Sequence, residues 1–129
     1  MFQQDQPKTL QEHGFYRVCS ATPKVHLGNP KKNSEEIIRF SQLADRSDAI
    51  ITLFPELSLT GYSLDDLFQQ RSLLEQATLH IETIRKASQG IRTAIVFGAP
   101  LIHEGSLYNT AIVICNGKIL GVVPKTYIP

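Results

Sequence analysis

One carboxylate follows a strand-like apolar run in the first half of the chain. Glu56 lies in the segment FPELSLTGY, residues 54–62. In α/β proteins, chemically active side chains sit where loops leave the carboxyl ends of parallel strands. Pro55 sets the direction in which the chain leaves the strand, and Gly61 permits a backbone conformation or a close approach that a Cβ would prevent. Glu56 is therefore a candidate catalytic carboxylate. The alternatives are the commoner roles of such carboxylates as helix caps or solvated loop residues.

An ammonium group occupies a comparable position near the end of the chain. Lys125 follows a short apolar run and Pro124, just as Glu56 follows its own apolar run and Pro55. Two strands would thus carry opposite charges to the same edge of a sheet. The alternatives are a surface ion pair or two unrelated loop residues.

The composition is that of a soluble globular domain. The chain has 129 residues, of which 42% are hydrophobic and 19% charged, and a formal net charge of +1. This charge provides no field that would attract nucleic acid or an anionic membrane. No apolar run approaches the length of a transmembrane helix, and the N-terminus lacks the pattern of a secretory signal. We expect a cytoplasmic protein without nucleic-acid or membrane partners.

The cysteines and histidines do not have the spacing of a metal site. Cys19 and Cys115 lie inside apolar, strand-like runs, which predicts buried thiols in a reducing compartment. The histidines also lack close paired spacing; they are His13, His26, His80 and His103. Neither glycine-containing loop, residues 28–30 or 98–100, has a phosphate-binding context. We expect no metal or cofactor site in these residues.

The first half of the chain predicts two strands and an intervening helix. Residues 15–21 alternate enough to form a strand. Asn29 and Pro30 have the residue types of an N-cap and a first helical position. The helix that follows has an apolar face at three- and four-residue steps: Ile37, Phe40, Leu43 and Ala44. Residues 49–54 form a near-continuous apolar run, typical of a strand buried on both faces.

The second half predicts one more helix and three strands. Residues 63–66, Ser-Leu-Asp-Asp, have the spacing of a capping box. A helical pattern follows a break near residues 70–71, ends at Gly90, and has an apolar face comprising Leu74, Ala77, Ile81 and Ile84.

Residues 93–98 are predicted to form a strand that stops before Pro100. Residues 107–115 and 118–123 flank Asn-Gly, the strongest short hairpin signal. The predicted order is β-α-β-α-β-β-β, an α/β fold whose parallel strands are extended by antiparallel ones into a mixed sheet.

These motifs resemble the nitrilase, or carbon–nitrogen hydrolase, superfamily, whose Glu-Lys-Cys triad is approached by segments much like PELSLTGY and PKTYIP. The chain resembles more closely the N-terminal glutaminase domain of glutamine-dependent NAD synthetases. The supporting segments are HGFYRV (13–18), LTGYSLDDLF (59–68), LYNTA (107–111) and GKILGVVPKTY (117–127). The resemblance implies part of a nitrilase-like α-β-β-α sandwich. It also implies the N-terminal part of a carbon–nitrogen hydrolase (glutamine amidotransferase) domain over residues 13–129. The polar residues 1–12 before it are expected to form an irregular N-terminal arm.

The resemblance also implies roles for individual residues. Glu56 would be the general base that takes the thiol proton of a nucleophilic cysteine, and Lys125 would stabilise the tetrahedral oxyanion. Tyr62 matches a tyrosine that lines the glutamine pocket, although it could equally pack beside Gly61. The family's nucleophilic cysteine lies beyond the lysine motif, so we expect it to be absent from this chain, which alone would be inactive. Burial would raise the pKa of Glu56 and Lys125 would lower it, and the sequence leaves the balance open.

In the intact protein, the resemblance implies hydrolysis of glutamine and transfer of ammonia to a synthetase domain. That domain would convert deamido-NAD to NAD with ATP and Mg²⁺, in a homo-oligomer. Two alternatives are a stand-alone amidase of the same superfamily that acts on another small amide, and a non-catalytic half-domain that serves as a scaffold.

Overall fold

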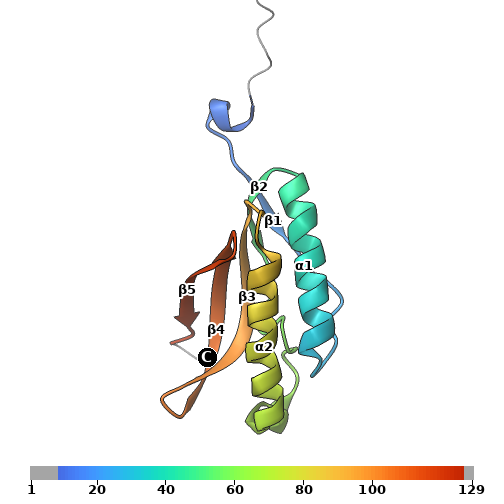
Figure 1. Ribbon diagram of the computed structural model, residues 1–129, viewed down its shortest axis with the longest axis vertical. Helices are drawn as coiled ribbons and strands as arrows, with labels where there is room; N and C mark the ends of the chain where they lie inside the picture. The colour runs from blue at the N-terminus through green and yellow to red at the C-terminus, as the bar shows by residue number, and fades with distance from the viewer. Residues whose placement is uncertain (1–8, 127–129) are drawn as a thin grey trace, which may run out of the picture.

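The computed structural model describes residues 9–126. They form one five-stranded sheet with two α-helices side by side on one face (Figure 1). The strands are β1 (Arg17–Ser20), β2 (Ala49–Leu53), β3 (Ala94–His103), β4 (Ser106–Cys115) and β5 (Lys118–Pro124). The helices are α1 (Pro30–Arg46) and α2 (Arg71–Ala87), with short 3-10 turns η1 (Gln11–His13) and η2 (Asp65–Gln69). The predicted order β-α-β-α-β-β-β is confirmed.

The sheet is mixed, as predicted, and its topology brings the ends of β2 and β5 to one edge. The strand order is β1-β2-β3-β4-β5, with β1, β2 and β3 parallel. β3, β4 and β5 are successively antiparallel. Two antiparallel steps restore the original direction, so β5 runs the same way as β2. The segments that follow β2 and β5 therefore leave the sheet at the same edge.

The hydrophobic core lies between the sheet and the two helices. Its fully or almost fully buried side chains come from both helices and from the central strands: Ile37, Ala77, Ile81, Ile84, Ile95, Phe97, Ile112 and Ile114. Burial of each large apolar side chain stabilises the fold by about 1.5–3 kcal/mol relative to its exposure. This layer fixes the position of β2, β3 and β4, the strands next to the candidate site.

Helix α1 begins where the sequence predicts, but its inner face is more polar than expected. The Asn29 side chain caps the helix by accepting a hydrogen bond from Lys32 N at 3.1 Å. Leu43, predicted to face the core, is exposed, whereas Ser41 is fully buried. The Ser41 hydroxyl donates to the carbonyl of Ile37 at 2.7 Å, and this bond offsets the cost of its burial.

Helix α2 begins at the predicted break but without the predicted capping box. Residues 65–69 form the turn η2, and neither η2 nor α2 has a side-chain hydrogen bond at its N-cap. Asp65 has a φ of 42°, which places it outside the helical conformation that a capping box requires. The helix ends at Ala87, shortly before Gly90. Neither α-helix of the described residues is long and apolar enough to cross a membrane.

Strand β3 continues through Pro100, contrary to the sequence prediction. Pro100 pairs with Asn109 of β4, whereas β2 pairs with β3 only as far as Val96. The edge of β3 beside Pro100 therefore has no strand partner among the described residues. Because no neighbouring strand requires a donor there, the lack of an N–H on Pro100 costs little stability. The Asn116-Gly117 hairpin turn is confirmed, with φ of 45° and 78°. A second turn of the same kind, at residues 104–105, was not predicted.

One face of the sheet is open in the described residues. Residues 49–54 were predicted to be buried on both faces, yet Ile51 and Leu53 are exposed. Val18 of β1, paired with Ile51, and Val123 of β5 are exposed as well. Both described α-helices cover the opposite face, so this row of apolar side chains has no second layer over it (Figure 1).

Candidate active site

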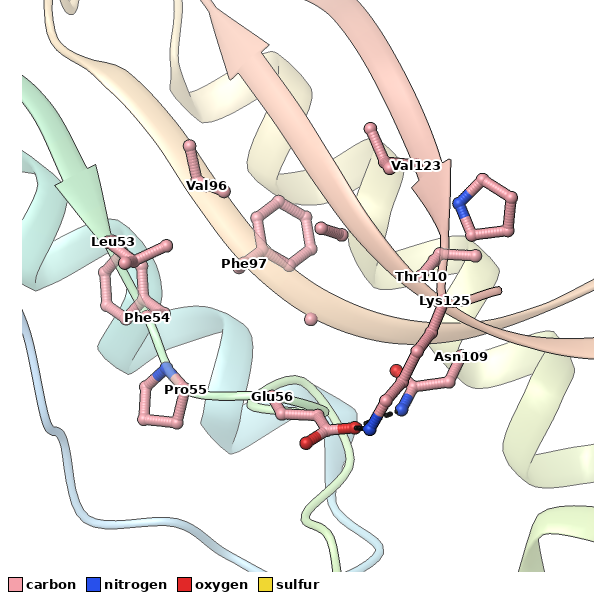
Figure 2. A pocket seen from close by; sticks show the side chains of 13 residues that line it. Leu53, Phe54, Pro55, Glu56, Val96, Phe97, Asn109, Thr110, Val123 and Lys125 are labelled. Carbon is pink, nitrogen blue, oxygen red and sulfur yellow. Dashed lines mark hydrogen bonds and ion pairs between the residues drawn. The ribbon is translucent and has the colours of Figure 1, made fainter. Parts of the chain in front are cut away.

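Glu56 and Lys125 meet at the edge of the sheet that the topology predicts. Nζ of Lys125 lies 3.0 Å from Oε1 of Glu56, although the residues are 69 positions apart in sequence. Figure 2 shows the lysine side chain reaching from beyond the end of β5 to the carboxylate that follows β2. The side chain of Lys125 is 37% exposed and that of Glu56 is 41% exposed, so the pair is open to solvent.

The loop that carries Glu56 is held tightly against β3. Phe54 N donates to the carbonyl of Val96 at 2.8 Å, which extends the pairing of β2 and β3 by one residue. Leu59 N donates to the carbonyl of Gly98 at 3.0 Å, and the buried Ser58 hydroxyl accepts from Gly98 N at 3.3 Å. Hydrogen bonds on both sides of Glu56 therefore fix its backbone.

Gly98 makes this close approach possible. A Cβ at position 98 would lie 2.2 Å from Leu57 N and 2.9 Å from the carbonyl carbon of Glu56. Only glycine fits where two backbones come so near. Leu57 itself has a φ of 50°, which is uncommon for a residue with a side chain. A glycine inside an apolar strand pattern is the sequence signal that could have identified Gly98, and sequence reasoning missed it.

The far side of the same loop is anchored to α1. Asn33 is buried, and its Nδ2 donates to the carbonyls of Leu59 at 3.0 Å and His26 at 2.8 Å. Gly61 has a φ of 94°, and a Cβ there would lie 2.6 Å from a methyl group of Leu27. The predicted need for glycine at position 61 is thus confirmed.

Asn109 of β4 joins the two charged residues and was not singled out from the sequence. Its Nδ2 donates to Oε1 of Glu56 at 2.5 Å, and its carbonyl accepts from the backbone N of Lys125 at 2.8 Å. In the sequence, Asn109 is a polar residue of a predicted strand, within the LYNTA segment that supports the resemblance, and no role was assigned to it. Its contact with Glu56 depends on the register of β4 against both neighbouring strands, which the residue pattern alone does not reveal.

The two donors lower the pKa of Glu56 below its ordinary value. The hydrogen bond from Lys125 is the largest cause and that from Asn109 the next, and together they outweigh the opposing effect of burial. The balance that the sequence left open is therefore decided in favour of the charged form. At neutral pH Glu56 is a carboxylate that can accept a proton.

Two hollows adjoin the ion pair, and Glu56, Asn109 and Lys125 line both. The first, of about 320 Å³, has mainly apolar walls that include Phe97 and Val123. The second, of about 510 Å³, is further lined by three aromatic residues, one acidic residue and two leucines: Tyr62, Phe68, Tyr108, Asp65, Leu57 and Leu107. The charged pair thus lies at the boundary between an apolar hollow and a wider, aromatic one.

Tyr62 lines the wider hollow, on the same side as the ion pair. Its side chain is 65% exposed. This exposure argues against the alternative of a packed aromatic beside Gly61. The predicted role of Tyr62 in substrate binding stays a prediction, but its position is compatible with that role.

The two cysteines lie away from the ion pair. Cys19 of β1 and Cys115 of β4 are free thiols of intermediate exposure, so the prediction of buried thiols was wrong. Neither lines either of the two hollows. Cys115 stands at the opposite end of β4 from Asn109, roughly 20 Å along the strand, and its thiol donates to the carbonyl of Arg92. Among residues 9–126, no cluster of three or more potential ligands could hold a metal ion.

Comparison with known proteins assigns the chain to a family. The family model described as carbon–nitrogen hydrolase matches residues 17–128. The chain therefore belongs to the carbon–nitrogen hydrolase family, as the resemblance of its motifs implied.

Individual relatives show which proteins of this family the chain is similar to. The chain is 38% identical over 118 residues to the glutamine-dependent NAD(+) synthetase of Mycobacterium tuberculosis. This match covers 92% of the chain but only 17% of the relative's length. A solved structure of the glutamine-dependent NAD+ synthetase of Acinetobacter baumannii is 31% identical, with a TM-score of 0.78. The match covers 87% of this chain and 21% of the Acinetobacter baumannii chain.

A more distant structure supports the fold alone. An amidase from Nesterenkonia sp., solved with butyramide, is 22% identical, with a TM-score of 0.75. The match covers 88% of this chain and 45% of the amidase chain. The sheet and helices described above thus have the nitrilase-like arrangement that the sequence predicts.

Proposed function

We propose that residues 13–129 are the N-terminal part of the glutamine-hydrolysing domain of a glutamine-dependent NAD synthetase. The observation that carries this proposal is the meeting of Glu56 and Lys125 at 3.0 Å, beside a hollow lined by Tyr62. The similarity to glutamine-dependent NAD synthetases of several bacteria supports glutamine as the substrate.

The geometry suits hydrolysis of an amide through a cysteine nucleophile. A thiol attacks an amide only as the thiolate, and it needs a base within hydrogen-bond reach. The Glu56 carboxylate would take the thiol proton. The Lys125 ammonium would stabilise the negative charge that develops on the amide oxygen, an effect worth about 3–4 kcal/mol for one donor of an oxyanion hole. Glu56 would return the proton to the leaving nitrogen, so that the C–N bond breaks and ammonia is released. Water then hydrolyses the thioester, which gives glutamate and restores the thiol.

The nucleophile and the ammonia-consuming step belong, in this proposal, to sequence outside residues 1–129. Cys19 and Cys115 line neither hollow, so a cysteine from another part of the intact protein would complete the triad. The ammonia would amidate deamido-NAD at a separate site that uses ATP and Mg²⁺. We infer a cytoplasmic homo-oligomer as the setting for this reaction. None of the residues described here is assigned to the ATP-dependent step.

The proposal is tested by comparing two nitrogen donors in the full-length protein. Glu56→Gln and Lys125→Met should each abolish NAD formation with glutamine, because the base or the oxyanion donor is lost. Both variants should keep NAD formation with added ammonia, which bypasses this site. NAD is measured with each donor, and glutamate release is measured separately. The exposed residues Glu35 and Lys118 provide matched controls, as Glu35→Gln and Lys118→Met, which should leave both activities unchanged.

Other outcomes distinguish the remaining candidates. Hydrolysis of simple aliphatic amides without use of glutamine would indicate a stand-alone amidase. Unchanged glutamine use in both Glu56→Gln and Lys125→Met would indicate a scaffold whose charged pair has no catalytic role.

A further inference from the structure

Asn109 contacts both members of the charged pair through two different groups. Its side chain donates to Oε1 of Glu56, and its main-chain carbonyl holds the backbone N of Lys125. The ammonium of Lys125 also donates to Oε1 of Glu56. Two donors therefore converge on the same carboxylate oxygen (Figure 2).

The other oxygen, Oε2, accepts no hydrogen bond from residues 9–126. Figure 2 shows one oxygen of Glu56 pointing away from both nitrogens. An oxygen that already accepts from an amide and an ammonium has fewer lone-pair positions available for a proton. The unoccupied oxygen is therefore the better acceptor.

We propose that Asn109 is a positioning residue that, together with Lys125, holds Oε1 of Glu56 and so presents Oε2 to the nucleophile. This inference rests on the proposed function above. In the step concerned, the S–H bond of the cysteine breaks and an O–H bond forms at Oε2. The electron pair stays on sulfur, which then bonds to the amide carbon of the substrate.

Lys125 alone would not hold the carboxylate through this step. Its ammonium sits on a flexible four-carbon chain and turns toward the amide oxygen as negative charge develops there. Asn109 has a short side chain on a strand that is paired on both sides. It lies opposite Pro100 of β3, and on the β5 side its carbonyl accepts from Lys125 N, next to the Thr110–Pro124 pair. The amide therefore keeps Glu56 in place while the ammonium is shared with the substrate.

Loss of the Asn109 amide has a predictable effect on titration. The ionisable groups that line the wider hollow with Glu56 are Tyr62, Asp65, Tyr108 and Lys125. Removal of the amide leaves all four in place and takes away one donor that favours the Glu56 carboxylate. The pKa of Glu56 must then rise, which moves the acid limb of the pH profile of kcat/KM to higher pH.

The test uses the full-length protein with Asn109→Leu, which keeps the approximate size of the side chain without its donor. We expect kcat with glutamine to fall about 100-fold, the effect of misplacing a reacting group by about 1 Å. KM should change little, and the acid limb of the pH profile of kcat/KM should shift to higher pH. Asn109→Asp keeps the shape but places a second negative charge beside Glu56, so both effects should be larger. The control Gln42→Ala removes an exposed side-chain amide from α1 and should change neither quantity.

Ammonia-dependent NAD formation and the thermal unfolding midpoint verify that each variant is folded. If Asn109→Leu is unstable, the isosteric Asn109→Asp variant decides the question. Unchanged kcat together with an unshifted acid limb would overturn the positioning role. Absence of glutamine use in the unsubstituted protein would instead refute the proposed function, so the two failures are distinguishable.

Discussion

At the scale of single residues, the candidate base depends on a residue that has no side chain. Gly98 lets the backbone of residues 56–57 approach β3. It also holds this loop with two hydrogen bonds: its N–H donates to the Ser58 hydroxyl, and its carbonyl accepts from Leu59 N. The residue types Glu56 and Lys125 are visible in the sequence. The sequence shows Gly98 as a glycine inside a strand pattern and Asn109 as a polar strand residue, but their roles depend on which backbone passes beside them.

Gly98→Ala should therefore damage the site without changing any group that reacts. The new methyl group must displace Leu57 and Glu56, at a cost of about 1–3 kcal/mol. We expect a lower thermal unfolding midpoint and a loss of glutamine-dependent activity in the full-length protein, while ammonia-dependent activity persists. The control Gly121→Ala adds the same methyl group where no atom lies within 4 Å. Equal effects of the two substitutions would contradict the role given to Gly98.

At the scale of elements, local signals in the sequence predict where elements begin and turn. The N-cap at Asn29 and the Asn116-Gly117 hairpin are both confirmed, because each depends on hydrogen bonds or dihedral angles within a few residues. Two sequence predictions, the end of β3 at Pro100 and the burial of Leu43, were wrong because contacts with distant parts of the chain determine both features. Pro100 lies in a strand because no strand requires its N–H, and Leu43 is exposed because the other helix and the sheet pack against a different face of α1.

One buried serine connects two elements that the sequence gives no reason to pair. The Ser88 hydroxyl, after the end of α2, accepts from Gly117 N at 2.8 Å and donates to the carbonyl of Arg85 at 2.7 Å. Ser88→Ala leaves the buried Gly117 N–H unsatisfied and should lower the free energy of unfolding by about 1–3 kcal/mol. Ser47→Ala is the matched change at the end of α1, where the hydroxyl is exposed, and should cost less than about 0.5 kcal/mol. Thermal or chemical unfolding measures both, and a cost for Ser88→Ala as small as that for Ser47→Ala would contradict the prediction.

At the scale of the whole molecule, we expect the open face of the sheet to govern how residues 1–129 behave when they are produced alone. Apolar side chains of β1, β2 and β5 are exposed together on that face, and β1 and β5 are both edge strands. Exposed apolar faces and unpaired strand edges favour self-association. The sequence indicated an apolar β2 but could not show which of its faces would be covered.

Residues 1–129 expressed alone should therefore self-associate at micromolar concentration. Val18→Lys, which places a charge on the open face, should shift the equilibrium toward monomer in sedimentation velocity experiments. Leu79→Lys is a matched control, because Leu79 is 55% exposed, comparable with 66% for Val18, but lies on α2 on the other side of the sheet. An equal effect of both substitutions would mean that association does not use the open face.

The topology that brings Glu56 to Asn109 and Lys125 also has a consequence for the order of folding. Strands β3, β4 and β5 are joined by two tight turns, so their pairing closes short loops, as in hairpins that form in about 1–10 μs. Pairing of β2 with β3 must instead close a loop that contains α2, at a larger entropic cost. Asn109 and Lys125 should thus come together early and Glu56 should join them last. Substitutions in the 116–117 turn should then slow folding, whereas those in the Glu56 loop should mainly speed unfolding.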